Sequence, residues 1–454
     1  MTDEAQGDVR VLPDAPPAGS GPKTWLAGLA ALVVGIAIIV IAAILLRPSD
    51  DTATNSAAPG EICASDASLV SSDCEALSTL ASSELGSTWM AAQGWVPNGD
   101  PCEWEGVTCE SDRLVSIDYS PDNYSGPIPA ELGGLTNLER LNIDADLTGG
   151  IPGELGELGQ LTSLALGGSL ADGIPLELGQ MSTLASLSID VSATESVVEI
   201  PAELGGLTNL TRLAITGDRI AGIPAELGDL TNLSELIITA NESGEIPPEL
   251  GNLTNLIRLS ISANLTGEIP RELGNLTNVS SLLLDANELT GEIPVELGNL
   301  SNLRVLSLDG NQFTGSIPAE LGNLTKLEEF VISADTLTGE IPVEFANLTN
   351  VYRLILRGGL TGEIPVELSN LTHLLQLSLG DQLTGEIPVE FGNLTDLNLL
   401  LLHGDLSGEV PAELSNLTNL TQLRLEGAEL TGSLPGNLSE TEALEIEGTG
   451  IVVD

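Results

Sequence analysis

Aromatic and basic side chains are both scarce in this chain of 454 residues. Phe, Trp and Tyr together make up 2% of it, which argues against several ordinary globular domains, because aromatic residues dominate ordinary cores. Lys and Arg number 14 against 66 Asp and Glu, which gives a formal charge of −52. Binding of phosphate backbones needs clustered basic residues, so we expect no nucleic acid partner. The hydrophobic fraction of 42% argues against disorder.

Histidine is nearly absent, which limits the possible chemistry. The chain has two, His373 and His403, which lie thirty residues apart. No Ser, Cys or carboxylate near them forms a nucleophile–base pattern, so we expect both to be surface residues. The sequence therefore predicts a protein that is not an enzyme and that requires no cofactor.

The four cysteines lie in one short segment of the chain, and this segment contains no histidine. Four cysteines allow three pairings. Their spacings do not match the usual zinc pairs, and a chain that is exported favours two disulfides over a metal site. The cysteines are Cys63, Cys74, Cys102 and Cys109.

A long uncharged segment lies near the amino terminus. Leu26 to Leu46 is a run of 21 residues without a charge. As a helix it would be about 31 Å long, which matches the thickness of a bilayer's hydrocarbon core, about 30 Å. A cleaved signal peptide usually has a shorter apolar stretch, of about 7–15 residues, behind a basic start. We therefore predict a retained single-pass anchor at 26–46, followed by a flexible linker at 47–62.

The residues that flank this segment suggest its orientation. Arg10 and Lys23 precede it and Arg47 follows it, a weak positive-inside bias that places a tail at 1–25 in the cytoplasm and the rest of the chain outside the cell membrane. Small residues every fourth position could bring two anchors together as a homodimer, although simple exposure to lipid explains them too. These residues are Ala27, Ala31 and Gly35.

An internal repeat occupies the remainder of the chain. Ile, Val or Leu followed by Pro recurs fourteen times from Pro129 to Pro435, in steps of 23 to 26 residues, within units that follow LxxLxLxxxxLTGxIPxELGNLTN. The LxL alternation indicates a short strand, and the proline indicates the first position of a short helical segment. One such coil cannot bury its leucines alone, so neighbouring coils must share a core. The sequence predicts an α/β solenoid over 114–454, curved, with a parallel sheet on its concave side.

These units resemble the leucine-rich repeat family, and the LTGxIP motif resembles its plant-type class, from Leu114 to about Ile446. The preceding sequence Cys102-Glu-Trp-Glu-Gly-Val-Thr-Cys109 is similar to the CxWxGVxC amino-terminal cap of plant receptor-like ectodomains and polygalacturonase inhibitors. The resemblance implies a cap at 63–113 and the disulfide Cys102–Cys109, and we expect Cys63 to pair with Cys74. It also implies that a protein or peptide ligand binds on the concave strand face. The chain departs from the receptor kinases in having its predicted anchor before the repeats, so no kinase role is expected.

Most outward positions of the predicted strands carry small or polar side chains, which lack the anchors that concentrate binding energy. One strand differs, because it alternates two arginines with an isoleucine, and apolar residues occupy nearby coils. We predict a ligand-binding spot there; scattered surface variation is the alternative. The predicted contact residues are Arg353, Ile355, Arg357, Val331 and Leu401, with Leu399 beside them.

Glutamates form two columns along the predicted solenoid. One follows each proline, where a carboxylate favours a helix amino terminus, and thirteen of the fourteen coils have it. The other column precedes the Ile-Pro step. Because 62 acidic residues but 11 basic ones follow Arg47, these columns suggest function in high salt or weak binding of divalent cations. The second column comprises Glu199, Glu245, Glu268, Glu292, Glu340, Glu363, Glu386 and Glu409.

The leading interpretation is thus a membrane-anchored, extracytoplasmic repeat protein for recognition or adhesion. A structural cell-surface protein, in which the acidic repeats themselves are the functional feature, is an alternative of another class. Ice binding is a further alternative, since regular solenoids can present flat Thr and Ser ladders, but Thr alignment on the predicted strands is poor.

Overall fold

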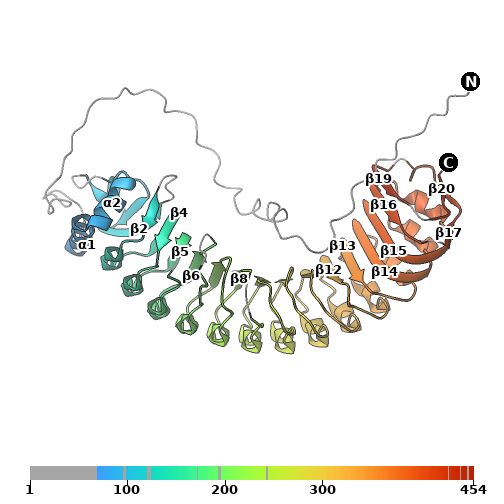
Figure 1. The fold of residues 1–454 in the computed structure, drawn as a ribbon, viewed down its shortest axis with the longest axis horizontal. Coiled ribbons are helices and arrows are strands. Elements are labelled where there is room, and N and C mark those ends of the chain that lie inside the picture. The colour runs from blue at the N-terminus through green and yellow to red at the C-terminus, as the bar shows by residue number, and fades with distance from the viewer. Residues whose placement is uncertain are drawn as a thin grey trace, which may run out of the picture. The chain divides into compact units, whose positions relative to one another are not determined.

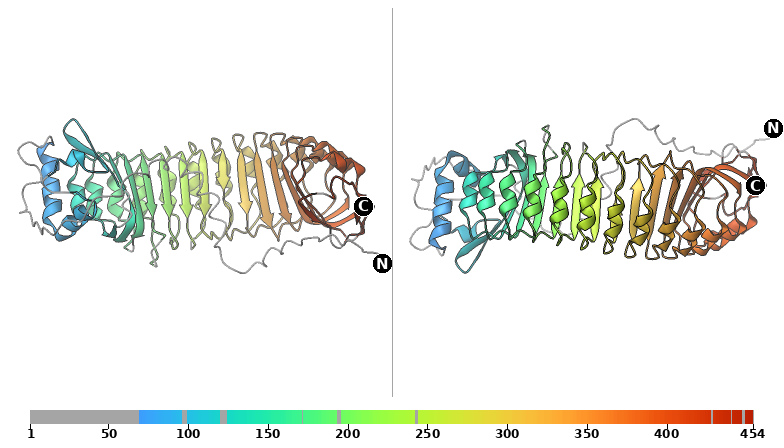
Figure 2. Two further views of the ribbon diagram at one scale, coloured as in Figure 1. Left: turned by 90° about the horizontal axis from the view of Figure 1, so that it is seen from above. Right: turned by 90° about the horizontal axis from the view of Figure 1, so that it is seen from below.

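The computed structural model describes residues 69–453 apart from 96–98, 120–123, 171, 193–195, 242–243, 428, 440 and 447–448. All of the described residues belong to one compact unit, Ala58–Asp454. Within this unit the coils stack side by side along an arc, with strands on the inner side and short helical turns on the outer side (Figure 1). The views from above and below show these two layers separately (Figure 2).

A small cap precedes the repeats. It consists of α1 (Ser71–Ser82), α2 (Glu84–Ala92), the 3₁₀ turn η2 (Pro101–Glu103) and the antiparallel strands β1 (Val107–Glu110) and β2 (Arg113–Tyr119). Its centre is aromatic: Trp95 stacks on Trp104 at a ring distance of 5.0 Å and meets Trp89 edge-on at 5.0 Å. These three rings are buried, so the few aromatic residues of the chain are used to close one end of a leucine core.

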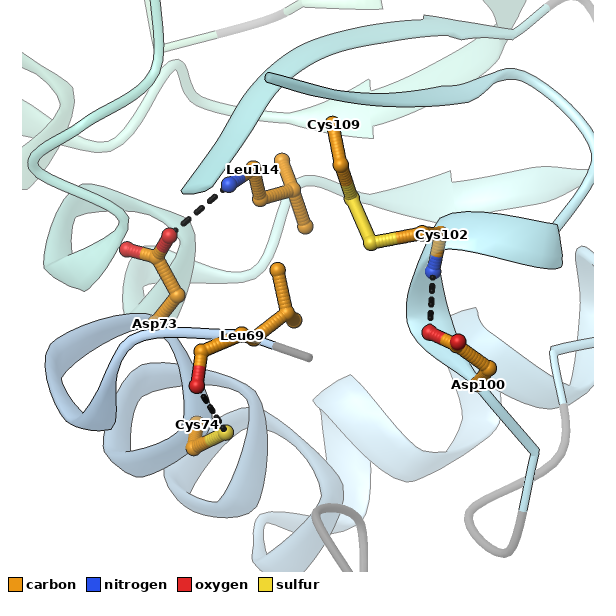
Figure 3. Close-up of a disulfide and its surroundings, with 7 residues drawn as sticks. All are labelled: Leu69, Asp73, Cys74, Asp100, Cys102, Cys109 and Leu114. Carbon is orange, nitrogen blue, oxygen red and sulfur yellow. Dashed lines mark hydrogen bonds between the residues drawn. A yellow bond between two sulfur atoms is a disulfide. The ribbon is translucent and has the colours of Figure 1, made fainter. Parts of the chain in front are cut away.

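A buried carboxylate joins this cap to the first coils. Asp73 of α1 accepts hydrogen bonds from the Leu114 backbone N–H at 2.8 Å and from Asn137 Nδ2 at 2.8 Å. Cys102 and Cys109 form a disulfide with an S–S distance of 2.05 Å (Figure 3), the pair that the family resemblance implies. Cys74 is also disulfide-bonded, while its predicted partner Cys63 lies outside the described residues.

Parallel strands form the inner layer, and β2, β4 to β16 and β19 pair in coil order. Each LxL unit buries its leucines and turns the intervening side chains outward, as Leu306 and Leu308 do in β11. The strands are β3 (Ser125–Pro127), β4 (Arg140–Gly149), β5 (Ser163–Leu170), β6 (Ser186–Asp190), β7 (Arg212–Thr216), β8 (Glu235–Thr239), β9 (Arg258–Ser262), β10 (Ser281–Leu283), β11 (Val305–Asp309), β12 (Glu329–Ala334), β13 (Arg353–Gly358), β14 (Gln376–Glu386), β15 (Leu399–Glu409), β16 (Gln422–Leu425), β17 (Glu429–Thr431), β18 (Ser433–Leu434), β19 (Ala443–Glu445) and β20 (Val452–Val453).

The outer layer is made of 3₁₀ turns, each of which begins directly after the proline of its coil. That proline has φ near −65°, as in Pro270 at −63°, and it precedes the turn as an extended residue. The predicted helical segments are therefore present but tighter and shorter than α-helices. The turns are η3 (Ala130–Gly134), η4 (Gly153–Glu157), η5 (Leu176–Gln180), η6 (Ala202–Gly206), η7 (Ala225–Asp229), η8 (Pro248–Asn252), η9 (Arg271–Asn275), η10 (Val295–Asn299), η11 (Ala319–Asn323), η12 (Val343–Asn347), η13 (Val366–Asn370), η14 (Val389–Asn393) and η15 (Ala412–Asn416).

The predicted fold class requires one correction, which concerns the membrane helix. The longest helix in the described part of the chain is α1, with 12 residues, about 18 Å in length, whereas a membrane span takes about 20 residues. No helix among the described residues is both long and apolar enough to cross a membrane. The predicted anchor 26–46, like the predicted tail at 1–25 and linker at 47–62, falls on residues that the structure does not describe. The architecture observed is the curved parallel-sheet solenoid with its cap.

Candidate ligand-binding site on the concave face

The sheet register brings the predicted contact residues onto adjacent strands. Val331 of β12 pairs with Ile355 of β13, which pairs with Ser378 of β14, and Ser378 pairs with Leu401 of β15. The next position in this row is Arg424 of β16. Because the coil length fixes the register, residues 23 or 24 apart in sequence become direct neighbours on this face.

The predicted residues differ in how much of their surface a ligand could contact. Val331 is only 5% exposed, so it contributes little contact area and was a poor choice for a contact residue. Ile355, Leu399 and Leu401 are half-buried and leave apolar surface at the centre of the face. We refer to these three residues, with Arg353, Arg357 and Arg424, as the concave patch.

The two predicted arginines have different partners. The Arg353 guanidinium is 3.4 Å from the Glu329 carboxylate, and the Tyr352 hydroxyl donates to that same carboxylate. This hydrogen bond, assisted by burial, raises the pKa of Tyr352 to about 12. Arg357 instead donates from Nε to the Ser378 hydroxyl at 2.9 Å. Among the described residues Arg357 forms no ion pair, so its charge remains available to a ligand.

A charged network, which the sequence analysis missed, borders the concave patch on β15, β16 and β19. Arg424 lies 2.6 Å from Glu426 and 2.9 Å from Glu445, and His403 Nδ1 lies 3.2 Å from Glu426. Burial by itself raises the pKa of Glu426, but the hydrogen bond from Arg424 and the attraction of His403 and Arg424 outweigh it and lower the pKa. The sequence signal was present, because His403 occupies the outward position two residues after Leu401.

His403 was predicted to be a surface residue, and it does occupy an outward position of β15, but its side chain is only 12% exposed. Its Nε2 is buried and has no hydrogen-bond partner among the described residues. Burial lowers the pKa of His403 below its ordinary value of 6.5, although attraction to Glu426 opposes the shift. Asp381 accepts a hydrogen bond from the Gly358 backbone N–H at 3.1 Å. Burial raises the pKa of Asp381, and the nearby His403 and Arg357 lower it in part.

The lowered pKa of His403 predicts that the folded state loses stability in mild acid. The unfolded chain takes up a proton near pH 6.5 more readily than the folded chain does, so stability should fall as the pH drops below about 6.5. Melting temperatures of the wild type, His403→Gln and His373→Gln at about pH 7.5 and about pH 5.5 test this. The His403→Gln variant should lose less of its melting temperature on acidification than the other two proteins. Equal losses in all three would contradict the prediction.

The described residues offer no constellation for a metal centre, because no group of three or more His, Cys, Asp or Glu among them could hold an ion. The concave patch places half-buried apolar side chains beside arginines on one face of the sheet, a composition that suits contact with another molecule.

Comparison with known proteins agrees with this geometry. A family model described as a leucine-rich repeat region matches residues 212–339. The plant peptide hormone receptor RGFR1, solved in complex with RGF2, is 30% identical to this chain, and the match covers 78% of this chain and 72% of the receptor with a TM-score of 0.62. The chain belongs to the leucine-rich repeat family.

Two further leucine-rich repeat structures show how widely the fold occurs. The ectodomain of GASSHO1/SCHENGEN3 from Arabidopsis thaliana, in complex with CASPARIAN STRIP INTEGRITY FACTOR 2, is 28% identical over 78% of this chain, with a TM-score of 0.51. The present chain spans 58% of that ectodomain's length. The leucine-rich repeat protein LIC12759 of Leptospira interrogans is also 28% identical, over 74% of this chain and 84% of that one, with a TM-score of 0.59.

Proposed function

We propose that this leucine-rich repeat protein binds a protein or peptide ligand at the concave patch, in a non-enzymatic role of recognition or adhesion. The observation that carries the proposal is the position of Arg357, which forms no ion pair with another described residue, beside the half-buried Ile355 and Leu401 in a protein whose net charge is −52. Arginine beside apolar surface is the composition in which binding energy concentrates. Two solved relatives, RGFR1 and the GASSHO1/SCHENGEN3 ectodomain, hold the ligands RGF2 and CASPARIAN STRIP INTEGRITY FACTOR 2, which supports a ligand of the same class.

Two finer assignments belong to the same proposal. We assign the repeats to the plant-type class on their LTGxIP motif, and the cap to the CxWxGVxC type on residues 102–109. We also propose that the repeats act outside the cytoplasm. The Cys102–Cys109 disulfide supports this, because disulfides persist in oxidising compartments and are rare where thiols are kept reduced.

The alternatives have less support in the geometry. A structural role for the acidic columns is favoured only by the exposure of the glutamates, among them Glu268 and Glu292. For ice binding, Thr216 and Thr239 pair across β7 and β8 at outward positions, but the next position in that row is Ser262. A row of two threonines provides little of the flat array that an ice surface would require.

A reversal of charge at the concave patch tests the proposal. Peptides that bind the full chain are selected from a random library at two salt concentrations. The Kd of each recovered peptide is then measured for the wild type and for the double variant Arg353→Glu with Arg357→Glu. We expect Kd to rise by about thirtyfold, equivalent to about 2 kcal/mol, because arginines that adjoin apolar contact surface are typical hot spots.

The matched control reverses two other outward arginines of the same sheet, Arg140 and Arg212, which lie on β4 and β7. Arg140→Glu with Arg212→Glu makes the same change in net charge and should leave the affinity nearly unchanged. Peptides that bind both double variants equally well would overturn the assignment of the concave patch.

A further inference from the structure

A second concave surface lies on the coils, away from the patch, where each chain segment enters its 3₁₀ turn. Two adjoining hollows of about 1070 Å³ and about 580 Å³ are lined by the Glu-Ile-Pro segments of successive coils, from Glu245 to Glu344. Glu292 lines both hollows, so they lie next to each other, and together we call them the lateral groove.

One wall of the lateral groove is a row of carboxylates held in place by the neighbouring coil. A Cβ on Gly267 would lie 2.9 Å from Cγ of Glu245, and a Cβ on Gly291 would lie 2.6 Å from Cγ of Glu268. The side chain of each glutamate therefore packs over the glycine of the next coil, which only a residue without a Cβ allows. The carboxylates are thus exposed and recur at the repeat spacing. The glycines have positive φ, +77° in Gly267 and +74° in Gly291, which also favours glycine at this position.

The charge of the lateral groove is almost entirely of one sign. The second wall includes Glu272, Glu320 and Glu344, which follow the prolines. Among the residues that line the two hollows the one basic side chain is Arg271, and it lies 3.3 Å from the neighbouring Glu272. Of the basic side chains that the structure describes, Arg271 is thus the one that lines the groove beside the row Glu245, Glu268 and Glu292.

The floor of the lateral groove is apolar. Ile269 and Ile293 line it with the prolines that follow them, and Val295 and Val343 are 50% and 52% exposed. Half-exposed valines between two acidic walls present apolar surface that water solvates poorly. A lone divalent cation would contact the carboxylates but would leave this apolar surface uncovered.

We propose that the lateral groove binds an extended, basic segment of a partner polypeptide, in which arginine or lysine alternates with apolar residues. Successive side chains of an extended chain point in opposite directions, so one set would cover Val295 and Val343 while the other set would reach the glutamates. The aliphatic stems of arginine and lysine would add contact with the floor. The net charge of −52 attracts such a segment from a distance and repels acidic ones. This surface is separate from the concave patch, and neither proposal depends on the other.

Binding of a synthetic peptide to the full chain tests the inference. The probe is a fluorescent twelve-residue peptide that alternates arginine and valine, measured by polarisation against a peptide that alternates arginine and serine. The first variant is Glu268→Gln with Glu292→Gln and Glu340→Gln. The second is Val295→Ser with Val343→Ser. The control is Glu367→Gln with Glu390→Gln and Glu413→Gln, which removes the same charge on coils beyond the lateral groove.

We expect the wild type and the control to bind the arginine–valine peptide alike and more tightly than the arginine–serine peptide. The first variant should bind it about tenfold more weakly, because exposed ion pairs are individually small and three of them act together. The valine variant should lose the preference for the arginine–valine peptide. The inference is overturned if the control loses as much affinity as the first variant, or if the valine variant keeps the preference. Folding of each variant is checked by its circular dichroism melting curve.

Discussion

Asn287→Ala is expected to lower the free energy of unfolding by about 3 kcal/mol, because it removes buried hydrogen bonds between coils. The Asn287 side chain is 4% exposed and lies in the turn after β10. Its Oδ1 accepts hydrogen bonds from the backbone N–H groups of Ala263 and Leu265, at 2.9 and 3.0 Å. Its Nδ2 donates to backbone carbonyls of its own coil and of the preceding one. Alanine would remove the Oδ1 that accepts from these two buried N–H groups, and the loss of a buried hydrogen-bond acceptor costs about 1–3 kcal/mol per donor.

Urea unfolding followed by circular dichroism measures this loss. The matched control is Asn302→Ala. Asn302 donates from Nδ2 to the Thr277 carbonyl at 2.8 Å and accepts from Lys326 Nζ at 2.7 Å, and both hydrogen bonds are exposed. Because water can replace these bonds, the control should change stability by less than about 1 kcal/mol. A comparable loss in both variants would show that the buried amide does not join the coils in the way its contacts indicate.

Phe345→Ala is expected to lower the free energy of unfolding by about 4 kcal/mol, through the cavity that it creates. Phe345 lies in η12 and is fully buried, and its ring meets that of Phe330 edge-on at a centroid distance of 5.2 Å. The two rings connect the outer layer to β12, the strand that carries Glu329 of the candidate site. Loss of one ring removes both its apolar burial and the edge-to-face contact.

Two other variants of η12 test whether the loss of stability comes from the buried ring or from any change in this turn. Val343→Ala changes a residue that is 52% exposed, and it should alter stability by no more than about 0.5 kcal/mol. Phe345→Leu keeps an apolar side chain of the kind that most coils carry at this position, as Leu321 and Leu368 show, and should cost less than about 1.5 kcal/mol. A Phe345→Ala protein as stable as Val343→Ala would contradict the packing described here.

The concave patch and the lateral groove differ in the chemistry that each offers. The patch places Arg357 and half-buried apolar residues on the sheet of an otherwise acidic protein, whereas the groove places fixed carboxylates around exposed valines. Ligands of opposite charge would therefore be directed to different surfaces of the solenoid. The peptide selection and the polarisation experiment examine these two faces independently.

The predicted site shows where reasoning from the sequence succeeds and where it stops. The repeat length places Arg353, Ile355 and Arg357 on the outward face of one strand, and this arrangement follows from the alternation of side chains along a strand. The pattern did not reveal that Val331 is almost buried, nor that His403 is enclosed beside Glu426. Burial of an outward side chain depends on the conformations of its neighbours in adjacent coils, which a repeat period does not specify.

The repeat pattern alone was enough to predict the stacked coils and the inward leucines, because each coil can bury its leucines only against the next coil. Which charges remain available depends on contacts that the folded structure makes. Arg353 is paired with Glu329, whereas Arg357 donates to the Ser378 hydroxyl, and Arg424 lies between Glu426 and Glu445. These contacts join residues in the same or neighbouring coils through particular side-chain conformations. The hydrophobic period fixes the core, but the ion pairs on its surface are set by local geometry that differs from one coil to the next.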